Sequence, residues 1–294
     1  MLALLAIAAA AGLTWHYTHI LTTAALYQRL PAQNAVVLFV DFEQLRKAGI
    51  LRMLEGSKVG EDPEYQTFVR ATNFDYKHDL DSALAAFAPT GKFLLLRGRF
   101  DWKSLRAYVA AQGGTCDNDL CRMQGSTPER RISFFPLASH LMAMAVSPDD
   151  SAALRLKTAS SAAAPELPRD PLWVSIPVSS LQSGENLPDG TRAFARTLRQ
   201  AESLTVAFAP EGQRLAAKMN VVCRNEVDAA DASLQLTHVT DLLRKMIEQE
   251  HQKPNAADLS GVLSSGSFRP DGRRVIGYWP IERVFVENML GSGH

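Results

Sequence analysis

The chain has 294 residues, of which 46% are hydrophobic and 21% are charged, and its 31 basic residues equal its 31 acidic residues. This composition excludes a disordered or fibrous protein, and the length allows one large core or two modest ones. A nucleic-acid partner is not expected, because there is no basic excess to displace counterions from phosphates.

The N-terminus is strongly apolar. Residues 1–28 contain no Lys, Arg, Asp or Glu, and aromatic residues follow the apolar run of residues 2–13, as is typical of a membrane interface. About 20 residues of helix cross a bilayer. We therefore expect residues 1–28 to be a membrane anchor that contacts the lipid bilayer through residues 1–22. The alternatives are a signal peptide cleaved at the alanines of residues 8–10, and a buried soluble helix.

The first half of the body is predicted to begin with a strand at residues 35–41 and a helix at 42–54. A second helix is expected to begin at Asp62-Pro63, with Asp as the cap and Pro in the first helical position. Further along, Asp101 is a plausible N-cap for another helix.

Two hexapeptides indicate hairpins. Residues 86–91 read Ala-Phe-Ala-Pro-Thr-Gly and residues 207–212 read Ala-Phe-Ala-Pro-Glu-Gly. In each, Pro-x-Gly supplies a turn between two apolar strands. We expect Phe87 and Phe208 to occupy equivalent inward positions.

The matching hexapeptides predict an internal repeat. The expected fold is α+β, with two related β-α-β-β-α-β-like halves that have antiparallel sheets and are similar to ferredoxin-like units, preceded by the transmembrane or signal-anchor helix. The halves are residues 29–158 and 172–294, the second opening with a strand at 172–178. A linker rich in Ala, Ser and Pro occupies residues 159–171.

The cysteines indicate whether the protein resides in an oxidising or a reducing compartment. Cys116 and Cys121 frame a short polar segment that is typical of a tight turn between strand ends, which favours a disulfide and hence an oxidising environment. Two reduced thiols, or a zinc site lacking the usual C-x2-C spacing, are the alternatives. Cys223 continues an alternating apolar strand, so it should point into the core.

The predicted disulfide and the charges favour opposite orientations. Arg29 and other basic residues after the apolar run weakly favour a cytoplasmic body, whereas a disulfide places the body outside the cytoplasmic membrane. We expect a single-pass protein of the cytoplasmic (inner) membrane with a periplasmic body.

A few side chains are weak ligand candidates. Asp75, His78 and Asp79 could bind a divalent ion, but their segment lacks the glycine and glutamate of a calcium loop and the paired histidines of a zinc helix. A solvated loop with capping Asp residues is therefore the leading interpretation. Arg130 and Arg131 could hold an anion, although paired arginines at the start of a strand commonly defend an exposed edge.

No sequence motif of catalysis is present: G-x-S-x-G, G-x-x-x-x-G-K-[ST], H-E-x-x-H and G-x-G-x-x-G are all missing. No catalytic residue, metal or cofactor is therefore predicted. We expect a non-enzymatic envelope protein that acts as a binding or assembly module for a protein partner. A hydrolase-like or metal-dependent enzyme whose site is assembled from distant residues, and an accessory subunit of a larger membrane complex, are the alternatives.

Several stretches together resemble a family of bacterial, acidobacterial-type, membrane-anchored envelope proteins of unknown function. They are residues 15–19 (Trp-His-Tyr-Thr-His), 62–65 (Asp-Pro-Glu-Tyr), 73–76 (Asn-Phe-Asp-Tyr) and 98–101 (Gly-Arg-Phe-Asp). The resemblance implies a single N-terminal anchor. It implies no activity, substrate or catalytic residue.

Overall fold

The structure is a computed structural model that describes residues 22–51, 63–161, 165–177, 201–212, 214–249 and 253–291, and the single positions 179, 194, 197 and 198. Of the predicted N-terminal membrane anchor, residues 1–21 lie outside these residues and residues 22–28 are described. Among the helices that are described, none combines the length and the apolar character needed to cross a bilayer.

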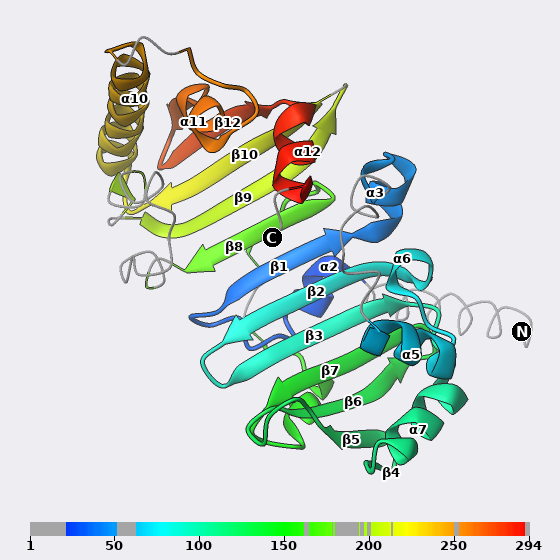
Figure 1. Cartoon of the computed structure of the whole chain (residues 1–294). Coiled ribbons are helices and arrows are strands. Elements are labelled where there is room, and N and C mark those ends of the chain that lie inside the picture. Colours follow the sequence, from blue (N-terminus) through cyan, green and yellow to red (C-terminus); the bar gives the residue numbers. More distant parts are fainter. Residues whose placement is uncertain are drawn as a thin grey trace, which may run out of the picture. The chain divides into compact units, whose positions relative to one another are not determined.

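In the described part of the chain, twelve strands follow one another in a single hydrogen-bonded order (Figure 1). Across that order they are β11 (Ser267–Asp271), β12 (Arg274–Ile281), β10 (Arg214–Cys223), β9 (Ala201–Glu211), β8 (Leu172–Pro177), β1 (Val36–Asp41), β2 (Leu80–Ala88), β3 (Gly91–Gly98), β7 (Leu141–Ser147), β6 (Arg131–Ala138), β5 (Leu120–Gln124) and β4 (Thr115–Asp117). The neighbouring pairs other than β1–β2 and β2–β3 have described registers, and each of them is antiparallel.

The prediction of two β-α-β-β-α-β-like halves with separate sheets is wrong. The opening strands β1 and β8 pair with each other, with Val37 opposite Ser175 and Phe39 opposite Trp173. An opening strand with a bare edge would expose unpaired backbone groups, and this pairing satisfies them. The strands therefore form one antiparallel order, and the described helices are few.

The chain divides into two compact units, each described here by itself. The first comprises residues 1–33 and 83–167, and the second comprises residues 34–82 and 168–294. Each unit is thus built from two separate segments of the chain.

The first unit contains α2 (Thr23–Tyr27), α7 (Trp102–Ala111) and the 3-10 helix η2 (Ala152–Lys157) beside its strands. Asp101 caps α7 as predicted, because its Oδ1 accepts hydrogen bonds from the amides of Lys103 and Ser104, both at 3.1 Å. The fully buried side chains of the first unit include Phe93, Leu95, Val109, Leu141 and Leu156.

The second unit contains α3 (Phe42–Lys47), α5 (Pro63–Thr72), α6 (Tyr76–Asp79), α10 (Glu226–Gln249), α11 (Leu259–Ser264) and α12 (Arg283–Gly291). Helix α10 packs on the strands β10 and β12, as Figure 1 shows. The buried core cluster that α10 helps to form comprises Phe194, Leu198, Leu204, Met219, Val221, Cys223, Ala229, Ala232, Leu236 and Val275. Cys223 therefore lies in the core, as predicted, and is not disulfide-bonded.

Two local helix predictions fare differently. Helix α5 starts at Pro63, as expected. The helix predicted over residues 42–54 is wrong as one continuous helix, because α3 ends at Lys47 and Gly49 adopts φ 74°. Ile50 and Leu51 are helical again, and residues 52–54 lie outside the described residues. A glycine in this left-handed region is a common helix terminator.

Each repeated hexapeptide leads into a hairpin, but only the first turns at its Pro-x-Gly, because Pro210 and Glu211 are still paired in β9. Strand β2 ends before Pro89 and β3 begins at Gly91, while Glu211 faces Arg214 at the end of the β9–β10 pair. The expected inward position of Phe87 is wrong, since its side chain is 42% exposed. Leu84 and Ala86 are buried instead, and successive side chains of a strand point to opposite faces. Phe208 is half-buried.

The packing of α10 yields a stability prediction. Replacing the fully buried Leu236 by alanine should lower the free energy of unfolding by about 2–5 kcal/mol, because a cavity remains in the core. Leu259→Ala, in the same unit but at an exposed position, is the matched control and should cost less than about 1 kcal/mol. Urea unfolding measures both, and equal costs would contradict the packing.

Candidate functional site

The three clustered ligand candidates form a capped turn. The backbone amide of Lys77 donates to Asp75 Oδ1 at 2.9 Å, and the amide of Asp75 donates to Asp79 Oδ2 at 2.9 Å. Asp75 is thus the N-cap of α6, and both carboxylates accept hydrogen bonds from the backbone of their own turn. The capping role predicted for these aspartates is confirmed, whereas the predicted solvated loop is wrong, because residues 76–79 form the short helix α6.

Tyr65 of α5 reinforces this turn. Its hydroxyl donates to Asp75 Oδ1 at 2.7 Å and accepts from the amide of Tyr76 at 3.3 Å. Burial, together with the hydrogen bond to the Asp75 carboxylate, raises the pKa of Tyr65 above its ordinary value. The contact ties α5 to α6 and leaves Tyr65 protonated near neutral pH.

The same turn brings a histidine close to a carboxylate. Nε2 of His78, whose side chain is exposed, lies 3.9 Å from Asp75 Oδ2. Across the described residues, no group of three or more His, Cys, Asp or Glu side chains is arranged to hold a metal ion. Asp75, His78 and Asp79 lie together in one capped turn.

The arginine pair lies at the start of β6, and both residues are exposed. Arg131 Nη1 lies 3.4 Å from Asp150 Oδ2. The backbone of Arg130 closes a turn, since its carbonyl accepts from Gly125 N at 2.7 Å and its amide donates to Thr127 O at 2.9 Å. These contacts fit a charged strand end, and an anion-binding role for the pair stays a prediction.

The predicted disulfide is confirmed between Cys116 and Cys121, which are direct cross-strand partners in the β4–β5 hairpin. Asn118 and Asp119 form the two-residue turn, with φ values of 47° and 70°. Positive φ at both central positions matches the right-handed twist of a hairpin, and Asn and Asp tolerate it well. Cys116 is half-buried and Cys121 is buried.

Cys223 differs from this pair. It is almost fully buried, and burial raises the pKa of its thiol. Little thiolate is therefore present near neutral pH, which is the form that acts as a nucleophile.

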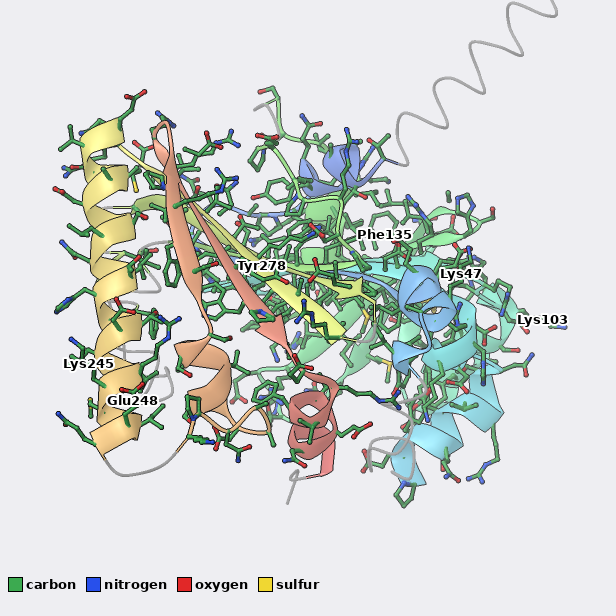
Figure 2. The ribbon with its side chains drawn as sticks, turned by 90° about the horizontal axis from the view of Figure 1, so that it is seen from above. Lys47, Lys103, Phe135, Lys245, Glu248 and Tyr278 are labelled. Atoms are coloured by element: carbon green, nitrogen blue, oxygen red, sulfur yellow. A yellow bond between two sulfur atoms is a disulfide. The ribbon has the colours of Figure 1, made fainter. Side chains whose placement is uncertain are left out.

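An exposed network joins the β9–β10 turn to β12. The Tyr278 hydroxyl donates to Glu211, and Arg214 lies 3.8 Å from Glu211 and 3.7 Å from Glu282. The hydrogen bond to Glu211 raises the pKa of Tyr278. Figure 2 labels Tyr278. Exposed pairs of this kind contribute little stability, so the network mainly orders the turn.

A surface that sequence reasoning missed lies on α10. Its exposed apolar side chains are Val227 (70%), Leu234 (70%), Leu242 (51%) and Met246 (53%). Leu236 belongs to the apolar row that packs inward on this helix. The sequence does contain a sign of this surface. It is a second apolar row, with Val227, Leu234 and Leu242 spaced seven and eight residues apart. This spacing returns to the same side of a helix after about two turns.

Comparisons with known proteins inform the fold alone. No protein family matches the sequence, and no curated protein matches it. The structure of crystal form I of TP0453 is similar, with a TM-score of 0.52 and 11% identity over 91% of this chain and 96% of that one. Crystal form IV of TP0453 gives 0.51 and 11% over 90% and 95%.

The disulfide should stabilise the hairpin by limiting its unfolded conformations. Replacing both Cys116 and Cys121 by serine should lower the free energy of unfolding by about 2 kcal/mol, as expected for so small a loop. A reductant should lower the free energy of unfolding of the native chain by the same amount and should not change that of the double variant. Hydrogen exchange should accelerate mainly in residues 115–124, and an unchanged exchange rate there would contradict the assignment.

Tyr65 should make stability fall at alkaline pH. Its raised pKa in the folded state gives a contribution that is complete below the unfolded pKa of about 10 and is lost as pH rises above it. Tyr65→Phe should lower the free energy of unfolding by about 1 kcal/mol at neutral pH, through loss of the hydrogen bond to Asp75, and should weaken the decline above pH 10. Phe68→Leu is the control on the same helix, and an alkaline decline identical in Tyr65→Phe and the native chain would refute the assignment.

Proposed function

We propose that this protein is a membrane-anchored component of a bacterial cell envelope, with its body on the periplasmic side, and that the body serves as a non-enzymatic binding or assembly module. The observation that carries the proposal is the Cys116–Cys121 disulfide. Such bonds persist in oxidising compartments and are reduced in the bacterial cytoplasm.

The apolar N-terminus supports the location. Residues 2–22 have the length and composition of a transmembrane helix, and such a segment would hold a folded body against the bilayer. An anchor and an extracytoplasmic disulfide are compatible in one chain when the body lies beyond the cytoplasmic membrane.

The surface chemistry supports binding as the role of the body. The carboxylates of Asp75 and Asp79 cap their own turn, so their oxygens already accept hydrogen bonds from the protein. Helix α10, in contrast, exposes large apolar side chains such as Leu234 and Leu242. Exposed apolar patches commonly mark sites where another molecule binds.

Fractionation tests the location. The full chain should sediment with membranes and should become soluble when residues 1–28 are deleted, because the apolar segment supplies the membrane affinity. Mass spectrometry of the N-terminus distinguishes a retained anchor from a cleaved signal peptide. A full chain that stays soluble without detergent would overturn the anchor.

Peptide mapping without reductant, on protein alkylated during cell lysis, completes the test. Cys116 and Cys121 should be recovered joined, while Cys223 should be alkylated after unfolding. Alkylation of all three cysteines would place the body in the cytoplasm and overturn the proposed location.

A further inference from the structure

The outward side of α10 carries a regular row of exposed residues, here called the outer seam. It comprises Val227, Asp231, Leu234, His238, Leu242, Lys245 and Gln249, all exposed. Successive members are three or four residues apart, which keeps them on one side of a helix. Figure 2 shows Lys245 on the side of α10 that faces away from the strands.

The inner side of the same helix is already occupied. Leu236 and Ala229 belong to the buried core cluster of the second unit. Arg244 fixes the C-terminal part, because its Nε donates to Ser264 O at 2.6 Å and its Nη1 to Asp241 at 2.8 Å. The outer seam is therefore presented by an anchored helix of 24 residues, about 36 Å long.

The outer seam is complementary to itself in the antiparallel direction. His238 lies at its centre, Leu234 and Leu242 are four residues before and after it, and Asp231 and Lys245 are seven before and after. When two copies align antiparallel about His238, Leu234 of each lies opposite Leu242 of the other. Asp231 of each then lies opposite Lys245 of the other.

We propose that the outer seam pairs with the outer seam of a second copy of this chain, as two antiparallel α10 helices related by a two-fold axis. This inference rests on the proposed role as an assembly module and names its partner. A two-fold interface uses the same patch on both copies. The pairing removes two leucines per copy from water and sets opposite charges together at both ends.

Charge determines the direction of the pair. A parallel arrangement would place Asp231 opposite Asp231 and Lys245 opposite Lys245, and like charges repel. In the described structure neither of these side chains has an ion-pair partner within its own chain, unlike Asp241, which pairs with Arg244 at 2.8 Å. Each is therefore available to a charge on another copy.

The charge of α10 also favours a protein over a lipid surface as the binding partner of the outer seam. The helix carries five acidic residues and two basic ones, Arg244 and Lys245. Helices that lie in a membrane interface are typically rich in Lys and Arg on their polar side and are attracted to anionic lipids. An acidic helix with Asp231 inside its apolar row is poorly suited to that surface.

Cysteine cross-linking of the full chain in a mild non-ionic detergent tests the pairing and its direction. His238→Cys alone should give a disulfide-linked dimer on oxidation, because the two central positions meet. Val227→Cys alone should stay monomeric, since its two copies would be about 33 Å apart. A mixture of Val227→Cys and Gln249→Cys chains should give the mixed dimer. Self-linking of Val227→Cys, or no linking of His238→Cys, would overturn the proposal.

Exchanging the two charges is a second test of the pairing. Sedimentation of the full chain in density-matched detergent measures its self-association. Asp231→Lys should weaken self-association about tenfold, and Asp231→Lys combined with Lys245→Asp should restore it. Leu234→Glu should abolish it, whereas Leu154→Glu, at another exposed leucine, should leave it unchanged. If Asp231→Lys and the double variant associate equally, charge complementarity is refuted.

Two further outcomes separate this inference from the proposed function. A monomeric chain that still fractionates with membranes and contains the Cys116–Cys121 bond would refute the pairing alone. A soluble chain with reduced cysteines that nevertheless cross-links through His238→Cys would refute the proposed location alone. Binding of the monomeric body to anionic phospholipid vesicles, lost in Leu234→Glu, would assign the outer seam to lipid and overturn the pairing.

Discussion

The antiparallel pairing of β1 with β8 holds the second unit together, because it joins segments from distant parts of the chain. Phe39 stacks on Trp173 with ring centroids 5.5 Å apart, and Trp173 is fully buried. The Asp41 amide donates to Pro171 O at 2.6 Å, which continues the contact beyond the strands. Each opening strand covers an edge that would otherwise expose unpaired amides and carbonyls. The strands before and after it can then follow in one antiparallel order.

A recurring use of aspartate explains why the sequence suggested ligands where the structure has caps. Asp41, Asp75, Asp101 and Asp258 each precede a helix and accept hydrogen bonds from its first amides. A carboxylate in this position satisfies backbone donors that have no partner within the helix. At Asp101, hydrogen bonds from Ser104 hold the pKa of the carboxyl below its usual range. In each of these caps the carboxylate has hydrogen-bond donors within its own helix.

Helix α10 combines two roles that its sequence alone does not separate. One side closes the core around Leu236, and the other presents the outer seam around His238. Core packing and the Arg244 contacts hold the helix in place. The helix therefore loses little conformational entropy when its outer side binds a partner. An anchored helix of this kind is suited to contacts with another molecule.

The sequence by itself determined the local features, because their physical causes lie within a few residues of one another. Pro89 and Thr90 marked the turn between β2 and β3, Asp101 placed the start of α7, and the spacing of Cys116 and Cys121 predicted their bond. The tertiary structure alone decided that β1 pairs with β8, that Phe87 is exposed, and that α10 has an uncovered apolar row. Edge pairing and burial depend on which distant segment covers each surface, and periodicity within one segment carries no information about that partner.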